Sequence, residues 1–196
     1  MSKVKKIVLS GLLLAVLIVL ERVIAFETQF LRFSFAYVPL MLSAIMLGPA
    51  WSTGIAVLGD VIGMLMFPKS AFFPGFTLNA LLTGLIYGLF LYNTKNDKQF
   101  LLRLILGTLT VLIVVHLLLT SLWLSIMYKS AFIALLSARV LIAAILLPIE
   151  VGTMFFLKKF LDPLVTKFMA PEEGTERPLV PDSEANNREE HYDTSV

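Results

Sequence analysis

Cysteine is absent from this 196-residue sequence, which excludes disulfide bonds, zinc sites built on thiolates and thiol nucleophiles. Only two histidines are present, His116 and His191, and they lie far apart in the sequence. The chain also lacks the Gly-x-x-x-x-Gly-Lys-Ser/Thr phosphate loop, the His-Glu-x-x-His zinc motif, the Gly-x-Ser-x-Gly nucleophile turn and a pair of aspartates suited to intramembrane proteolysis. We therefore predict that the chain is not an enzyme, binds no metal or cofactor and does not hydrolyse ATP itself.

Charge is scarce as well. Asp, Glu, Lys and Arg make up 15% of the residues, whereas about 25% is usual in soluble domains. Hydrophobic residues make up 58%, and the mean hydropathy is +0.86. The formal net charge is only +2, and the basic residues are scattered, which argues against a nucleic-acid partner. The excess apolar surface must face lipid, so the composition predicts an integral membrane protein.

Six apolar segments are long enough, or nearly long enough, to cross a bilayer. They are residues 7–25, 34–48, 51–66, 77–93, 100–127 and 132–161. We predict an all-α membrane domain of six transmembrane helices over residues 1–168, followed by a disordered cytoplasmic tail over 169–196. The N-terminal lysines and the first apolar run also resemble a signal peptide. That interpretation is disfavoured because Glu21 and Arg22 would lie just before the cleavage site.

The basic residues of the loops predict the orientation of the helices, because cytoplasmic loops are enriched in Lys and Arg. One side would carry Lys3, Lys5, Lys6, Lys95, Lys98, Arg103, Lys158, Lys159 and Lys167. The other side would carry Arg32, Lys69 and Lys129. Both termini are therefore expected in the cytoplasm. The second and third segments are short, which is tolerated where their ends line a cavity. Because the tight Gly48-Pro49 turn closes the inner end, we expect this cavity to open outward.

Ionisable side chains at membrane depth are costly and usually face a cavity or a partner. In this chain they are Glu21, Arg22, Asp60, His116, Arg139 and Glu150. Most are expected toward the outer ends of their helices, together with Arg32, Lys69, Asn79, Trp123 and Tyr128. Such a set suits an anionic, planar, hydrogen-bonding ligand, because Arg binds carboxylates and aromatic rings stack on a flat heterocycle.

Purely structural alternatives remain open for the same residues. Arg22 could pair with Glu21 or extend to the outer interface, and Asp60 could pair with an arginine to hold the bundle together. Phe72 and Phe73 would suit an interfacial aromatic belt. Glu150 follows Arg139 by eleven residues, which is about 16 Å along a helix. We therefore expect it to lie too deep for the outer pocket and to serve in structural pairing or coupling. His116 is expected to be a donor in helix packing.

Small residues recur at a spacing of four on three segments, which lets helices approach closely in lipid. These residues are Gly11 and Ala15, then Gly59 and Gly63, and then Ala80, Gly84 and Gly88. The first pair shares one helix face with Ile18 and Arg22. That face begins as a smooth contact strip at the cytoplasmic end and ends in a cation at the outer mouth, so it could serve both a partner and a ligand.

Several motifs together resemble a known transporter family. The stretches at residues 31–40 and 47–51 and the Gly-Asp-Val-Ile-Gly block at 59–63 resemble the S components of energy-coupling-factor (ECF) vitamin transporters. The Phe-Phe-Pro-Gly-Phe-Thr-Leu block at 72–78 and residues 82–90 are similar to the folate-specific members. The resemblance covers nearly the whole membrane part, about residues 7–165.

The resemblance implies a substrate-binding membrane subunit of a prokaryotic plasma membrane. Such a subunit captures a vitamin from outside, docks on a membrane-embedded scaffold subunit with two cytoplasmic ATPases, and topples to deliver its ligand. The family's Ala-x-x-x-Ala docking motif matches Gly11 and Ala15, with Gly in place of the first Ala.

Folate suits the expected pocket, because its glutamyl end is dianionic and its pterin ring is planar with many donors and acceptors. The residues predicted to bind it are Arg22, Asp60, Lys69, Phe73, Asn79, Trp123 and Arg139. The sequence leaves open which cation meets which end of the ligand.

Three other functions are weighed against this one. An S component for another vitamin, such as riboflavin, thiamine or a queuosine precursor, stays in the same class, although several outer cations disfavour the cation thiamine. A non-transport membrane scaffold would have outer charges that pair off and leave no pocket. A self-sufficient secondary carrier would be expected to contain inverted repeats. No convincing repeat relates residues 1–93 to 100–165.

Overall fold

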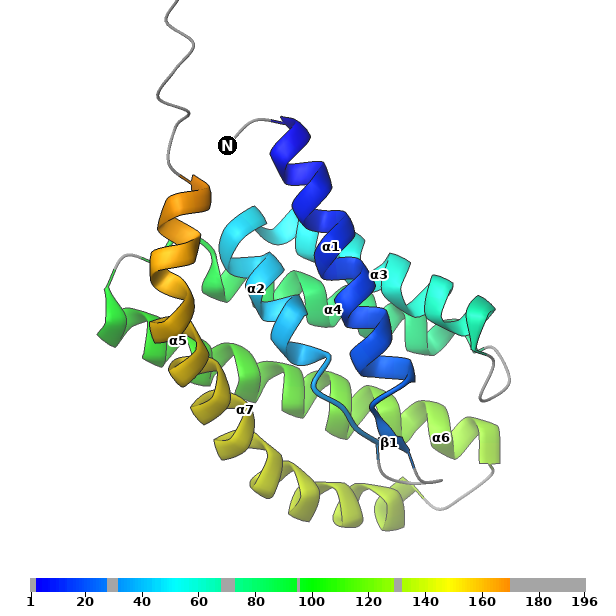
Figure 1. Cartoon of the computed structure of the whole chain (residues 1–196). Helices are drawn as coiled ribbons and strands as arrows, with labels where there is room; N and C mark the ends of the chain where they lie inside the picture. Colours follow the sequence, from blue (N-terminus) through cyan, green and yellow to red (C-terminus); the bar gives the residue numbers. More distant parts are fainter. Residues whose placement is uncertain (1–2, 28–31, 68–72, 95, 129–131, 170–196) are drawn as a thin grey trace, which may run out of the picture.

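The computed structural model describes residues 3–27, 32–67, 73–94, 96–128 and 132–169, which fold into a helical bundle (Figure 1). The helices are α1 (Lys3–Arg22), α2 (Tyr37–Leu47), α3 (Pro49–Met66), α4 (Pro74–Leu91), α5 (Asp97–Thr110), the π-helix η1 (Val111–Leu119), α6 (Thr120–Tyr128) and α7 (Phe132–Met169). Because α5, η1 and α6 form one uninterrupted run, the described chain has six helical segments. Each lies within a few residues of its predicted position, except that α7 continues to Met169. Met169, the first residue of the predicted tail, is the last residue of α7, and the rest of that tail, residues 170–196, lies outside the described residues.

The surface of the bundle is that of a membrane protein. Three described helical stretches are long and apolar enough to cross a bilayer, namely Pro49–Met66, Pro74–Leu91 and Asp97–Met127, and α2 is a shorter apolar helix. Large apolar side chains face outward on several helices; for example, Leu65 is 79% exposed and Phe160 is 71% exposed. Such surface would aggregate in water and is stable only against lipid or a partner. The prediction of a helical membrane protein is confirmed at this level.

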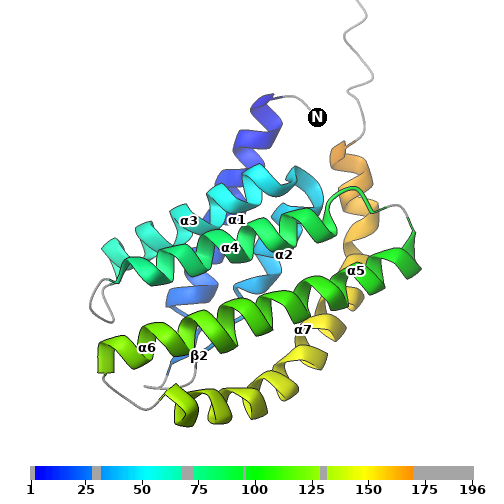
Figure 2. The ribbon, with the colours of Figure 1, turned by 180° about the vertical axis from the view of Figure 1, so that it is seen from behind.

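Helix α4 lies at the centre of the bundle and packs against α2, α3 and the α5–η1–α6 run (Figure 2). Its contact with α3 is especially close because glycines face that helix. A Cβ atom on Gly84 would lie 2.7 Å from the carbonyl oxygen of Ser52, and a Cβ atom on Gly88 would collide with the backbone of Pro49. The Ser52 hydroxyl also donates a hydrogen bond to the Gly84 carbonyl over 2.8 Å. The predicted close approach through small residues is confirmed here.

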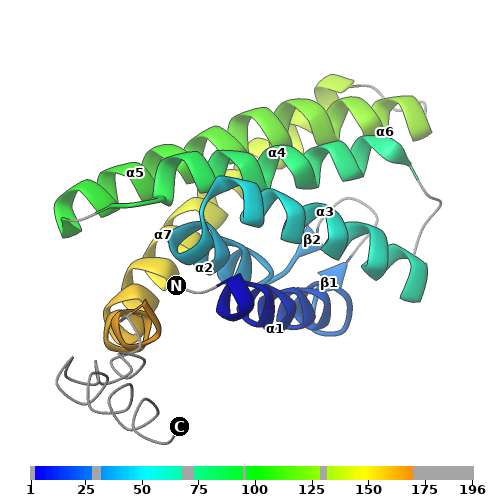
Figure 3. The same cartoon turned by 90° about the horizontal axis from the view of Figure 1, so that it is seen from above.

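Helix α1 lies on α3 in the same manner. A Cβ atom on Gly59 would lie 2.5 Å from the Leu17 side chain, and a Cβ atom on Gly63 would lie 2.7 Å from Nε of Arg22. Figure 3 shows the resulting layers, with α1 on one side, then α2 and α3, then α4 and finally the α5–η1–α6 run. The glycines of α3 therefore admit the helix that carries Arg22.

The corner between α2 and α3 depends on glycine. Gly48 has a φ of +88°, a conformation that side chains with a Cβ rarely adopt, and Pro49 begins the next helix. The ring of Tyr92 lies against Gly48, so that a Cβ atom there would come within 3.0 Å of it. The tight turn predicted from Gly48-Pro49 is confirmed.

Two local features depart from the all-α prediction. Strands β1 (Phe26–Glu27) and β2 (Arg32–Phe33) pair antiparallel, with Phe26 opposite Phe33 and Glu27 opposite Arg32. Such a ribbon satisfies backbone N–H and C=O groups between two helices, which a sequence scan for apolar helices does not consider. Within the long run, η1 adopts π-helical hydrogen bonding, for which no sequence signal was identified. Segments of this kind often lie at functional sites.

Candidate functional site

A cavity of about 340 Å³ lies inside the bundle between α4 and α7. Both helices contribute residues at relative positions 0, 3, 4, 7 and 11, which form one face of a helix. On α4 these residues are Phe76, Asn79, Ala80, Thr83 and Tyr87. On α7 they are Arg139, Ile142, Ala143, Leu146 and Glu150. The two helices run in the same direction (Figure 2), so Phe76 and Arg139 mark one end, here called the outer end, and Tyr87 and Glu150 mark the inner end.

The other walls come from four more segments. Arg22 and Leu17 contribute from α1, Tyr37 and Leu40 from α2, and Asp60 from α3. The remaining wall is η1 with the start of α6, including Leu112, Val115, His116, Leu117, Thr120 and Leu124. The volume lies within the range of small-molecule sites, about 300–1,000 Å³, and the lining combines apolar surface with a few polar groups. The arrangement therefore suits one small organic ligand with polar ends.

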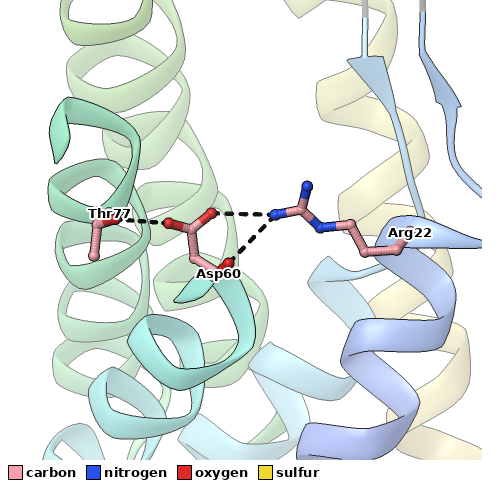
Figure 4. A network of polar contacts seen from close by, with 3 residues as sticks. All are labelled: Arg22, Asp60 and Thr77. Atoms are coloured by element: carbon pink, nitrogen blue, oxygen red, sulfur yellow. Dashed lines mark hydrogen bonds and ion pairs between the residues drawn. The ribbon is translucent and has the colours of Figure 1, made fainter. Parts of the chain in front are cut away.

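Arg22 and Asp60 form a buried ion pair at one wall of the cavity (Figure 4). Nη2 of Arg22 lies 3.5 Å from Oδ1 of Asp60 and 3.4 Å from its main-chain oxygen, and the Thr77 hydroxyl donates to Oδ2 over 2.8 Å. Each charged residue is 6% exposed. Within the described residues Nε of Arg22 has no hydrogen-bond partner. The alternative that Asp60 pairs with an arginine is thus realised, although both residues also line the cavity.

Arg139 is held by the π-helical segment. Its Nη1 donates to the main-chain oxygen of His116 over 3.3 Å. The guanidinium of Arg139 therefore lies against the part of η1 that contains His116. His116 was expected to donate in helix packing. That role of its side chain stays a prediction. The main-chain oxygen of His116 accepts from Arg139, and the residue also lines the cavity.

Asn79 is part of a hydrogen-bond chain between α4 and α6. Its Oδ1 accepts from Nε1 of Trp123 over 3.1 Å, and its Nδ2 donates to the Thr120 hydroxyl over 3.0 Å. Thr120 in turn donates to the main-chain oxygen of Val115 over 2.7 Å. The amide group therefore already has one donor and one acceptor satisfied by protein. Asn79 still lines the cavity, and it fixes the Trp123 ring beside it.

The predicted aromatic residues lie together at the start of α4. The rings of Phe73 and Trp123 are 5.5 Å apart between centroids, and Phe73 also contacts Phe76 at 6.0 Å. Of these three, Phe76 lines the cavity. Phe73 and Trp123 form the layer beside it, so their contact with a ligand stays a prediction. Lys69 lies outside the described residues.

The expectation that Glu150 lies too deep for the pocket is wrong. The cavity follows α7 for three turns, about 16 Å, and Glu150 closes its inner end. Tyr87 of α4 lines the same end of the cavity. Sequence reasoning also missed Tyr37, Tyr87 and Thr83 as lining residues. For Glu150 a sequence signal was available. It follows Arg139 by eleven residues, or three helical turns, which places both side chains on one face of the helix.

Comparison with known proteins identifies the architecture. A family model described as "ECF transporter, substrate-specific component" matches residues 5–158. The chain belongs to this family. The resemblance drawn from the sequence motifs is thereby confirmed, and the cavity of this S component lies within the matched region.

The similar proteins are folate transporters. The chain is 35% identical over 164 residues to the folate transporter FolT of Clostridium novyi, covering 84% of this chain and 94% of the relative. It is 38% identical over 158 residues to FolT of Leuconostoc mesenteroides, covering 78% and 84%. Among solved structures, a crystal structure of FolT bound with folic acid superposes with a TM-score of 0.73 at 41% identity, covering 80% of this chain and 93% of that one.

Proposed function

We propose that this S component binds folate outside the cell and serves as the substrate-binding subunit of an ATP-driven ECF vitamin transporter in a prokaryotic plasma membrane. The observation that carries the proposal is the cavity between α4 and α7, which has arginines at its outer part and hydrogen-bonding groups along its length. The similarity to a FolT crystallised with folic acid supports the choice of vitamin.

The chemistry of folate matches the lining. Its glutamate carries two carboxylates, which Arg139 and Arg22 can bind through charge-assisted hydrogen bonds. Its pterin and p-aminobenzoyl rings are flat and fit between the apolar side chains of α4 and α7. Asp60 supports this role by holding Arg22 in place, and Asn79 does so by fixing Trp123. Lys69, Phe73 and Trp123 are proposed to contribute from the outer loop and the adjoining aromatic layer.

The proposed orientation places both termini in the cytoplasm. In the bundle, α1 begins and α7 ends at the same end of the molecule (Figure 1). Lys5 and Lys6 lie near the start of α1 and Lys158 lies in the last third of α7, so these predicted cytoplasmic cations are at this end of the bundle. Lys158 pairs there with Asp97 at 2.8 Å. With that end inward, the outer end of the cavity faces the medium from which the vitamin is captured.

Folic acid titrated into the purified protein should quench tryptophan fluorescence saturably, and Arg139→Gln should weaken its affinity about 10- to 100-fold. The reason is the loss of a charge-assisted contact to the ligand's carboxylates. A Trp51→Phe background leaves Trp123 as the reporter, since the chain has two tryptophans.

The matched control is Arg103→Gln, which removes an exposed arginine of α5 and should leave the affinity unchanged. Saturable binding of riboflavin or another vitamin in place of folic acid would keep the family and change the substrate. Absence of binding to every vitamin, checked by calorimetry, would favour a scaffold without a small ligand.

Docking on the coupling module is proposed to use the small residues of α1. Gly11 and Ala15 are exposed, and a Cβ atom on Gly11 would meet nothing within 4 Å. Gly11→Leu should therefore leave folic acid affinity unchanged in detergent but lower ATP-dependent uptake at least tenfold, because the larger side chain blocks close helix approach. Gly152→Leu, at another exposed glycine with open space, is the matched control and should transport normally. Normal uptake by Gly11→Leu would contradict the docking role.

A further inference from the structure

Helix α7 has a proline in its interior. The helix runs without interruption from Phe132 to Met169, and Pro148 lies near its middle. Proline has no N–H group to donate to the carbonyl of Ala144 one turn earlier, and its ring presses against that carbonyl, so a proline at such a place bends a helix. The two parts of α7 run in different directions (Figure 1 and Figure 2). Residues 132–147 are called the outer half here, and residues 149–169 the inner half.

The inner half is fixed to the rest of the bundle. Met154 is fully buried and belongs to the hydrophobic core, and Val151 packs against that core. Nζ of Lys158 lies 2.8 Å from Oδ1 of Asp97 at the start of α5 and 4.2 Å from the centre of the Phe100 ring. The exposed ion pair is weak by itself, but the cation–π contact and the buried Met154 hold the same stretch of helix. The inner half therefore stays with α5.

The outer half has a different environment. Of the side chains that the structure describes in this half, none belongs to the hydrophobic core that contains Met154. The inward face lines the cavity through Arg139, Ile142, Ala143 and Leu146. On the opposite face Val140 is 51% exposed and Ile145 is 56% exposed, and lipid covers such apolar surface equally well at any position of the helix. A helix with a cavity on one side and lipid on the other can move with little loss of core packing.

We propose that the outer half of α7 is a movable wall of the cavity and that Pro148 is its hinge. The missing hydrogen bond lowers the cost of bending at Pro148, whereas an intact helix resists bending. Outward movement breaks the 3.3 Å hydrogen bond from Arg139 to the main-chain oxygen of His116 and widens the cavity on the side of η1. Inward movement closes the cavity. The hinge thereby sets how fast a ligand enters and leaves, and this part of the inference rests on the proposed function.

Distances between pairs of spin labels test the hinge, and the absence of cysteine allows labels to be placed at chosen sites. Leu58 on α3 is a suitable reference, because α3 packs closely on α4 and this side chain is 51% exposed. One pair combines Leu58→Cys with Ile145→Cys in the outer half. The other combines Leu58→Cys with Phe156→Cys in the inner half, where Phe156 is 67% exposed. Pulsed electron paramagnetic resonance of the purified protein in detergent gives both distance distributions.

In the ligand-free protein we expect the distribution from Leu58 to Ile145 to be at least about twice as broad as the one from Leu58 to Phe156. Saturating folic acid should narrow the first distribution, because a ligand in the cavity contacts α4 and the outer half together and favours the closed position. The second distribution should stay unchanged, because the inner half is fixed with or without a ligand.

Pro148→Ala restores the N–H group and should narrow the distribution from Leu58 to Ile145 without any ligand. It should also slow the association and the dissociation of folic acid by a similar factor, about threefold or more, and leave the affinity nearly unchanged. A residue that only contacted the ligand would change the affinity instead, and Pro148 does not line the cavity. Pro163→Ala is the matched control, because it replaces another proline of α7 beyond Lys158 and should alter neither the distances nor the rates.

Equal widths of the two distributions in the ligand-free protein would overturn the hinge, as would a Pro148→Ala protein with unchanged widths and rates. The label pairs in the wild-type background decide the matter even if Pro148→Ala fails to fold. A distribution from Leu58 to Ile145 that stays broad with folic acid bound would overturn the role of the wall in holding the ligand. Complete absence of folic acid binding would refute the proposed function, whereas the ligand-free distributions would still test the hinge.

Discussion

Asp60→Ala is expected to lower the free energy of unfolding by about 3–5 kcal/mol, the usual cost of removing one partner from a buried ion pair. Arg22 is 6% exposed, and its guanidinium pairs with Asp60 through the side chain and the main chain. After the substitution the arginine remains buried beside Gly63 without its counter-charge. Thermal unfolding of the purified protein in detergent, followed by circular dichroism, measures the loss.

A double-mutant cycle separates the pair from the loss of side-chain volume. The combined variant Arg22→Met with Asp60→Ala should be more stable than Asp60→Ala alone, because the unpaired charge is then gone. Thr77→Val is the matched control for the remaining contact and should cost about 1 kcal/mol, the value of one hydrogen bond. Costs that simply add in the combined variant would show that Arg22 and Asp60 are not coupled.

The second large effect is expected at the contact between α3 and α4. Gly88→Leu should prevent the protein from folding to a monodisperse species, because even a Cβ atom there would meet the backbone of Pro49 and the Ser52 hydroxyl. Gly88→Ala should still cost about 1–3 kcal/mol from overpacking, although alanine favours a helix by about 1 kcal/mol over glycine. Backbone atoms cannot move aside as a flexible side chain could.

Gly152→Ala provides the comparison at a helical glycine with no atom within 4 Å of the new Cβ. It should leave stability unchanged or raise it by up to about 1 kcal/mol through helix propensity alone. Size-exclusion profiles and unfolding temperatures of the three variants supply the measurement. A Gly88→Ala protein as stable as Gly152→Ala would mean that α3 and α4 pack less closely than the structure indicates.

These two sites explain why the residues that line the cavity hold their positions. The α3–α4 contact places Asp60 and Asn79 on neighbouring helices, and the Thr77–Asp60 hydrogen bond links the same two helices. The Asn79–Trp123 bond then connects α4 to α6. Loss of the α3–α4 contact would therefore displace the residues of the cavity that these two hydrogen bonds connect, in addition to lowering stability.

The sequence by itself determined the helices, the family and part of the site. Apolar runs of membrane length, the Gly48-Pro49 corner and the glycines at spacing four are local patterns, because each depends on neighbouring residues or on a single helix face. Gly11 and Ala15 are also a local pattern, because they could be matched to the docking motif of the family by their spacing alone. Both are exposed in the fold. The ionisable residues could be identified as costly because burial of charge in a membrane is unfavourable wherever the helix lies.

Only the tertiary structure decided how these residues are combined. Arg22 pairs with Asp60 across 38 positions, Asn79 binds Trp123 across 44, and Arg139 reaches a carbonyl of a π-helical segment. Each of these contacts depends on how far the helices are rotated and shifted against one another. That arrangement is decided by small energy differences between many possible long-range packings. Glu150 is the clearest case. Its depth along α7 was calculable from the sequence, but whether that depth held protein or a cavity depended on the spacing between α4 and α7.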